Sequence, residues 1–205
     1  MSKKVNSKQK QSGSKERIIN VAVSLFARHG YAGTGMRELA ANAAVNLAMV
    51  NYFFGSKKGL LKEILDSFFA RYLLIAKEEL TGEGTLEEKL EKFTRRSVLF
   101  FDASRDYLLV AINELPHDDP EIIEHKAAWA QQMIGLIDKE ICQPLADEYG
   151  TIIPPTVLAP LLTSTMASRF LFAPVMETVF PEGCVAVSLE EYTKTISSSL
   201  TKMIS

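Results

Sequence analysis

Apolar residues recur along this chain with the spacing of helices, and no segment shows the alternation that is typical of strands. In the first segment, Ile18, Ala22, Leu25 and Phe26 lie at i, i+4, i+7 and i+8, which places them on one face of a helix. Gly30 is expected to end this helix, because glycine readily adopts the left-handed conformation that follows many helices. The pattern predicts an all-α fold.

Two short helices are predicted next, over residues 35–42 and 46–53. Leu39 and Ala40 face inward in the first of them, and Thr34 is a candidate N-cap. Only about three residues separate the two helices, which is the spacing of a helix-turn-helix that reads DNA.

The rest of the chain has further helical stripes with clear signals at their ends. A helix from residue 57 to about 79 precedes one that opens with the capping box Thr85-x-x-Glu88, and a short helix starts near residue 105. Asp119-Pro120-Glu121 then opens a long helix that ends at Gly150. The last two helices cover residues 156–172, where Pro174 is expected to kink or break the helix, and the segment after residue 188. The bundle would thus have about nine helices in all.

Motifs in residues 30–57 resemble those of the tetracycline-repressor (TetR) family of transcriptional regulators. They keep their order and spacing over about a quarter of the chain. The matching residues are Gly30-Tyr31-x-x-Thr34, Met36-Arg37-Glu38-Leu39-Ala40, Ala43-Ala44-Val45-Asn46 and Asn51-Tyr52-Phe53-Phe54-Gly55-Ser56-Lys57. The chain departs from the usual pattern at Gly35, Ala44, Asn51 and Phe53.

This resemblance implies a three-helix DNA-binding domain followed by a C-terminal bundle that binds an effector and dimerises. We expect a disordered basic tail in residues 1–14, the helix-turn-helix domain in residues 15–56 and the effector-binding and dimerisation domain in residues 57–205. The implied function is a transcriptional regulator, a repressor that a small, largely apolar or aromatic effector releases from a palindromic operator. Such a protein is cytoplasmic, is not an enzyme and needs no cofactor.

The distribution of charge agrees with DNA as a partner of the first third of the chain. Residues 1–62 contain eleven Lys or Arg but only two acidic residues, Glu16 and Glu38, so this segment has a net charge of +9. The whole chain has a net charge of −2. A basic domain within an acidic chain indicates a surface that attracts phosphates.

Two lysines stand where helix electrostatics disfavours them. Ser56 is expected to cap a helix, which puts Lys57 and Lys58 against the positive end of its dipole. A phosphate bound there would be stabilised by lysine charge and by free backbone N–H groups. We expect contacts with DNA phosphates from Thr34, Tyr52, Lys57 and Lys58.

Base reading is assigned by the family resemblance rather than by the charge. Asn51 has the donor and acceptor for a bidentate contact with adenine, and Arg37 has the fork that suits guanine. The resemblance places base-edge or groove contacts at Arg37, Asn46, Leu47, Ala48 and Asn51.

Large aromatic residues are spread over the helices of the second domain, with arginines between them. Side chains of this kind mostly form a core, but they also line effector cavities in helical bundles. The candidate pocket residues are Phe68, Tyr72, Phe93, Arg96, Phe100, Trp129, Met133 and Phe170.

The last two predicted helices have apolar stripes that one small domain cannot bury completely. We therefore expect an obligate homodimer in which both copies use the same two helices. The predicted interface consists of Val157, Leu158, Leu161, Leu162, Met166, Tyr192, Ile196, Leu200 and Met203.

Two other classes of function remain open at this point. Glu121 and His125 form an i,i+4 pair that can bind a divalent metal, with His117 and Asp119 nearby, so a small helical metal-binding protein or enzyme is one alternative. The other interpretation of this cluster is a capped helix start with solvated histidines. A helix-turn-helix interaction module without an effector is the second alternative.

A membrane partner is not expected. Residues 149–168 carry no charge, but they contain three prolines and six Ser or Thr, which suits a buried helix better than a membrane span. Cys142 and Cys184 lie far apart and lack the spacing of a zinc site, which favours a reduced, cytoplasmic chain.

Overall fold

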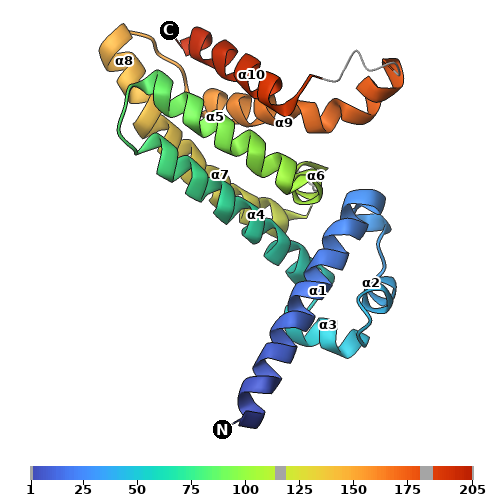
Figure 1. The fold of residues 1–205 in the computed structure, drawn as a ribbon. Coiled ribbons are helices and arrows are strands. Elements are labelled where there is room, and N and C mark those ends of the chain that lie inside the picture. Colours follow the sequence, from blue (N-terminus) through green and yellow to red (C-terminus); the bar gives the residue numbers. More distant parts are fainter. Residues whose placement is uncertain (1, 114–118, 181–186, 205) are drawn as a thin grey trace. The chain divides into compact units, whose positions relative to one another are not determined.

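The computed structural model describes residues 2–113, 119–180 and 187–204, with the side chains of residues 2–12, 113, 203 and 204 outside that description (Figure 1). Every regular element in these ranges is helical, so the all-α prediction is confirmed. The elements are α1 (Ser2–Gly33), α2 (Met36–Asn42), α3 (Leu47–Phe54), α4 (Lys57–Leu80), α5 (Leu86–Ala103), α6 (Arg105–Asn113), α7 (Pro120–Ile137), the π-helical segment η1 (Asp138–Cys142), α8 (Gln143–Tyr149), α9 (Pro155–Val179) and α10 (Leu189–Ile204).

The first helix is longer at its start than the sequence pattern indicates. α1 begins at Ser2, so residues 2–14, which we expected to be a disordered tail, are helical in the structure. Of its thirteen residues four are Lys and two are Gln, which extend a helix at little cost, and none is proline. The helix is interrupted at its predicted end, because Gly30 has the non-helical angles φ 74° and ψ 160°, and a short further helical stretch reaches Gly33.

The start of α2 differs from the prediction in its cap. The N-cap is Gly35, and Thr34 instead donates its hydroxyl to the carbonyl of Gly30 at 3.0 Å. Thr34 is only 2% exposed, and a buried hydroxyl needs a partner, which the end of α1 supplies. The hydroxyl of Thr34 thus closes the first helix rather than opening the second.

Pro174 does not end its helix. We expected Pro174 to kink or break the helix, and it does not break it, because α9 continues to Val179. Pro174 has no N–H for the carbonyl of Phe170, four residues before it, but one missing bond in a helix of 25 residues is a loss that the turns on both sides can compensate. The long helix predicted up to Gly150 is also continuous, with the π-helical segment η1 just before Pro144.

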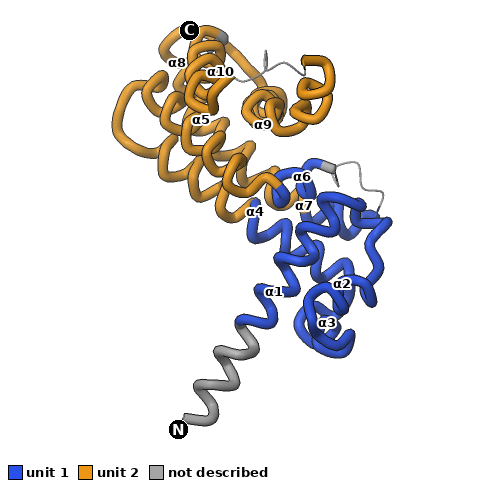
Figure 2. Tube along the Cα trace, turned by 45° about the vertical axis from the view of Figure 1, so that its right-hand side comes forward, with its two compact units in different colours: residues 1–68, 106–125 blue, residues 69–105, 126–205 orange. Residues whose placement is uncertain are grey.

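The chain divides into two compact units, coloured separately in Figure 2. The first unit comprises residues 1–68 and 106–125, and the second comprises residues 69–105 and 126–205. We had expected the division between residues 56 and 57. The start of α4, most of α6 and the start of α7 instead belong to the unit that contains the helix-turn-helix.

The second unit has α5 at its centre, in contact with both α9 and α10. Tyr72, Phe93 and Phe101 pack ring against ring, with centroids 6.0 Å apart for Tyr72 and Phe93 and 5.1 Å apart for Tyr72 and Phe101. Among the described helices, α9 is the one that is long and apolar enough to cross a membrane by length and composition alone. One such helix is weak support for a span, because core helices have the same composition.

Candidate nucleic-acid interface

The first unit contains a helix-turn-helix built on a small aliphatic core. Leu39, Ala43 and Val50 are fully buried, and α2 and α3 both pack on α1. The turn is tight: the backbone N–H of Val45 donates to the carbonyl of Ala40 at 3.0 Å. These contacts fix α3 relative to α2, which a reading helix requires.

The turn contains a residue in an unfavourable conformation. Ala44 has a φ of 51°, in the left-handed region that glycine adopts without strain and alanine does not. This is the position at which the chain departs from the usual glycine of the related motif. The fold therefore keeps the turn at a cost of roughly 1–2 kcal/mol.

The residues predicted to read bases gather around the start of α3, with one on α2. Asn51, Ala48 and Arg37 are exposed, and Leu47 is half-buried. Asn46 is the N-cap of α3, and its side-chain oxygen accepts the N–H of Met49 at 2.8 Å. Its amide group remains for a base or phosphate, but its orientation is set by the cap.

The residues predicted to contact phosphates occupy four different environments. Tyr52 is 75% exposed and suits the prediction, whereas Thr34 is buried with its hydroxyl bonded to Gly30, so its side chain is not available. The ammonium of Lys57 lies over the ring of Tyr31, 4.3 Å from its centroid. Lys58 is held by acidic residues of α7.

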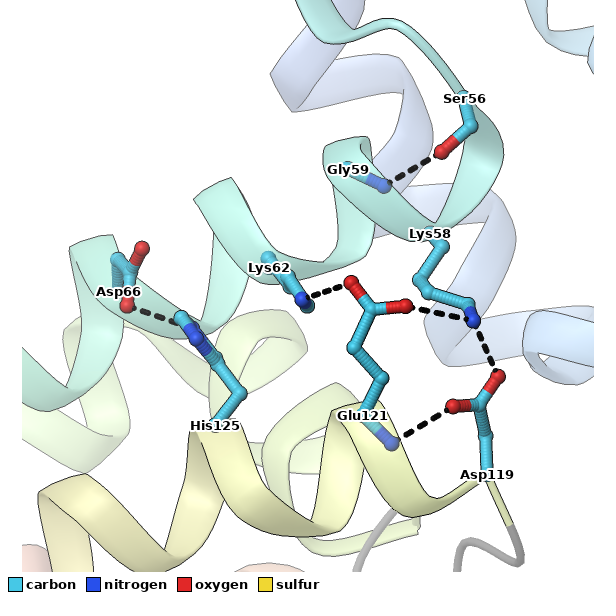
Figure 3. Close-up of polar contacts among 8 residues, drawn as sticks. All are labelled: Ser56, Lys58, Gly59, Lys62, Asp66, Asp119, Glu121 and His125. Atoms are coloured by element: carbon cyan, nitrogen blue, oxygen red, sulfur yellow. Dashed lines mark hydrogen bonds and ion pairs between the residues drawn. The ribbon is translucent and has the colours of Figure 1, made fainter.

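Figure 3 shows these acidic contacts, which we did not predict. Lys58 Nζ lies 2.6 Å from an oxygen of Asp119 and 2.9 Å from an oxygen of Glu121, and Lys62 bonds to the other oxygen of Glu121. One turn further along, His125 Nε2 is 2.8 Å from Asp66. The sequence shows that Lys58, Lys62 and Asp66 share one face of a helix, which was the available signal for these contacts. It does not show their partners, because those lie far along the chain.

The ion pairs shift the ionisation of their members. Hydrogen bonds from Lys58 lower the pKa of the Asp119 carboxyl, and those from Lys62 and Lys58 lower the pKa of the Glu121 carboxyl. The same contacts with Asp119 and Glu121 raise the pKa of the Lys58 ammonium. All three groups are therefore charged near neutral pH.

The residues that we considered as a metal site take part in these acid–base contacts and in the cap of α7. Glu121 is bonded to lysines, His125 Nε2 lies 2.8 Å from Asp66, and Asp119 caps α7 by accepting the N–H of Glu121 at 2.9 Å, so the predicted N-cap is confirmed. His117 lies outside the described residues. Within the described part of the chain, no three His, Cys, Asp or Glu side chains gather as metal ligands would.

The predicted effector residues lie in both units and differ in their burial. Phe68 belongs to the first unit and the others to the second. Arg96 is exposed and pairs with Glu78 at 2.7 Å and Glu79 at 2.5 Å. Of the others, Tyr72, Phe93, Met133 and Phe170 are buried, while Phe100 and Trp129 are half-buried.

Tyr72 is the one buried aromatic residue of this set with a polar group. Its hydroxyl lies 3.0 Å from that of Thr163, and burial raises its pKa well above the usual range.

An open groove of about 800 Å³ lies between α5 and α10. It is lined by Glu91, Arg95, Leu99, Leu189, Glu190, Thr193, Lys194, Ser197, Ser198, Thr201 and Lys202.

The predicted dimer residues separate into two groups. Leu158, Leu162, Met166 and Leu200 are buried within the second unit, so they are not available to a second copy. Tyr192 and Ile196 are half-buried, and the side chain of Met203 lies outside the described residues. An exposed apolar row runs along α9 at helical spacing, from 40% to 58% exposed, and we call it the α9 stripe: Val157, Leu161, Phe172, Val175 and Val179.

Comparison with known proteins places the helix-turn-helix in a family. Residues 18–64 match the model described as "Bacterial regulatory proteins, tetR family". A probable HTH-type transcriptional regulator of Bacillus subtilis, YttP, is 36% identical over 80 residues, which span 38% of this chain and 39% of the relative. An uncharacterized HTH-type transcriptional regulator of Xanthobacter autotrophicus is 27% identical over 95% of this chain and 90% of its own length.

Solved structures resemble the chain over most of its length. The chain is similar to AibR in complex with isovaleryl coenzyme A and operator DNA, with a TM-score of 0.71, 17% identity and coverage of 93% of this chain and 97% of that one. It is also similar to FadR from Bacillus subtilis in complex with stearoyl-CoA, with a TM-score of 0.69, 15% identity and coverage of 91% and 97%. At this level of identity the likeness shows a shared fold.

Proposed function

Because the chain belongs to the TetR family, we propose that it is a repressor that binds a palindromic operator as a homodimer and leaves it when an acyl-coenzyme A or a similar largely apolar effector binds. The observation that carries the proposal is the rigid helix-turn-helix with Asn51 and Arg37 exposed beside it. These side chains have the donor and acceptor patterns of adenine and guanine readers. We place the protein in the cytoplasm, where the operator is.

Dimerisation is the second part of the proposal, and the α9 stripe supports it. Five apolar side chains share one face of α9, two near its start and three near its end, and exposed apolar surface of this kind often marks an interface. Pairing of two such faces by a two-fold axis would cover both at once. Two reading helices about 34–36 Å apart would then enter successive major grooves of a palindrome.

The choice of effector class rests on the neighbours in structure. AibR and FadR were crystallised with isovaleryl coenzyme A and stearoyl-CoA, and the present chain shares their fold over more than nine-tenths of its length. The aromatic and aliphatic core of the second unit suits an acyl chain, which needs apolar surroundings. Because closely packed cores leave few voids, an acyl chain would have to open space among these residues.

Selection from a pool of random duplex DNA tests the proposal. We expect the purified protein to enrich a palindromic motif whose half-sites are about one helical turn apart or a multiple of it. Addition of isovaleryl or stearoyl coenzyme A should lower the affinity for that motif, while free coenzyme A should not. Enrichment without any response to acyl-coenzyme A would favour the helix-turn-helix interaction module, and absence of enrichment would reject the DNA-binding function.

A further inference from the structure

The start of α7 and the start of α4 are joined by a row of acidic and basic side chains, which we call the α4–α7 ladder (Figure 3). It consists of Lys58, Lys62 and Asp66 on α4, and of Asp119, Glu121 and His125 at and after the beginning of α7. All six residues belong to the first unit, which also contains the helix-turn-helix.

The start of α7 fixes the positions of the carboxylates at the lysine end of the ladder. Asp119 uses one oxygen to cap α7, which leaves its other oxygen directed at Lys58 at 2.6 Å. Glu121, two residues on, places one oxygen 2.9 Å from the same ammonium and the other against Lys62. Lys58 is thus held by two carboxylates whose positions are fixed by the start of one helix.

Lys58 lies directly after the reading helix, at the second residue of α4. The cap on this helix start is Ser56, whose hydroxyl accepts the N–H of Gly59 at 3.0 Å. A phosphate at this helix end would be attracted by an ammonium group there. An ammonium already bonded to two carboxylates is neutralised and adds little to that attraction.

Acidic residues from later in the chain also reduce the net positive charge of the whole first unit. By sequence the unit has eleven Lys or Arg and ten Asp or Glu, and six of these acids lie in residues 106–125. The strongly basic segment 1–62 therefore folds together with an acidic segment that offsets most of its charge. The two carboxylates of the ladder bring this opposite charge into direct contact with a lysine beside the reading helix.

We propose that Asp119 and Glu121 compete with the DNA backbone for Lys58 and so lower the affinity of the protein for DNA. This inference rests on the DNA-binding function proposed above and names a means of regulating it. When the start of α7 keeps its carboxylates on Lys58, the lysine makes no phosphate contact. When the start of α7 withdraws them, Lys58 adds one phosphate contact and binding tightens.

The test neutralises the two carboxylates without removing the helix cap. In the variant Asp119→Asn/Glu121→Gln, asparagine can still cap α7, while neither side chain bears charge. Binding to a duplex of random sequence is measured against salt concentration. We expect the slope of log K against log salt to steepen by about one ion, which makes the gain in affinity at roughly 50 mM salt about three- to four-fold larger than at 200 mM.

Two control variants separate the proposal from a general effect of charge. Glu124→Gln removes an acidic group from the exposed side of the same helix, where Glu124 has no ion pair with any described residue, and should leave the slope unchanged. Lys58→Gln should leave the slope of the wild-type protein unchanged, because Lys58 is already neutralised there. Combined with Asp119→Asn/Glu121→Gln, it should abolish the gain.

The outcomes are distinct for the inference and for the proposed function. A slope of the double variant equal to that of Glu124→Gln, or a gain that survives removal of Lys58, would overturn the competition while DNA binding itself remained. A wild-type protein that binds no duplex at any salt concentration would overturn the proposed function and the competition together. A shift of the slope by about one that requires Lys58 supports the competition.

Discussion

The two units of this protein are stabilised by different kinds of contact. The first unit has a core of aliphatic residues such as Leu39, Val50 and Leu60 together with the buried ring of Phe26, and its α4 and α7 meet through charged groups at the surface. The second unit has a cluster of packed rings in its core, in which Phe101 contacts Tyr72 and Phe170. Ion pairs occur in both units, but those of the first unit include Lys58, directly after the reading helix, so salt and local charge act there beside that helix.

Hydroxyl groups add a second contrast. Tyr192 OH lies 3.0 Å from the hydroxyl of Ser168 and donates to the carbonyl of Thr165 at 2.9 Å, which ties α10 to α9 without charge. Contacts of this kind depend little on salt. The comparison teaches that a change in DNA affinity with ionic conditions should arise in the first unit, where an ion pair lies beside the reading helix.

The largest expected effect comes from the core of the second unit. Phe101→Ala removes a fully buried ring and should lower the free energy of unfolding by about 3–5 kcal/mol, because the aromatic cluster cannot close the cavity. Denaturant titration measures this loss. Leu99→Ala, on the exposed side of the same helix, should cost far less, and equal losses for the two variants would show that the ring cluster does not carry the stability of this unit.

The next effect concerns the surface of the second unit. Leu161→Glu/Val175→Glu places two charges on the α9 stripe and should raise the dissociation constant of the predicted dimer by about 100-fold or more, roughly 3 kcal/mol. Sedimentation over a range of concentrations measures it, with Leu74→Glu as the control at an exposed leucine of α4. A wild-type monomer at micromolar concentration, or a dimer unaffected by the double substitution, would contradict the assignment.

In the first unit the reading helix gives the next effect. Asn51→Ala should weaken binding to the selected site by roughly 1–3 kcal/mol and relax the preference at one base position, because the bidentate contact is lost. Binding-site selection with the variant measures both changes. If the variant enriches the same motif with the same stringency, Asn51 does not read a base.

The smallest effect is a gain in stability. Ala44→Gly relieves the left-handed conformation in the turn, and we expect about 0.5–1 kcal/mol of added stability after subtracting the effect of glycine's greater backbone entropy in the unfolded chain. Thermal unfolding of the two proteins measures this. Ala41→Gly, in the interior of α2, should destabilise instead, because alanine is the better helix former there.

The hydrophobic pattern of the sequence was sufficient to predict the helices. Periodicity predicted the all-α fold, and local capping signals at Thr85, Asp119 and Ser56 are all confirmed by hydrogen bonds in the structure. Such signals depend on side chains within about one turn of each other, so the sequence alone contains them. The motifs of residues 30–57 likewise identified the family, because they record the packing of a short, contiguous domain.

Contacts between distant segments were decided only by the tertiary structure. The partners of Lys58 lie about sixty residues along the chain, so its charge appeared free to meet phosphate until α7 was placed beside α4. The same holds for Leu158 and Leu162, which share helical stripes with exposed residues but turn out to be buried. A helical pattern determines which residues share a face, whereas the packing of the helices determines which face meets water, an acid or another apolar surface.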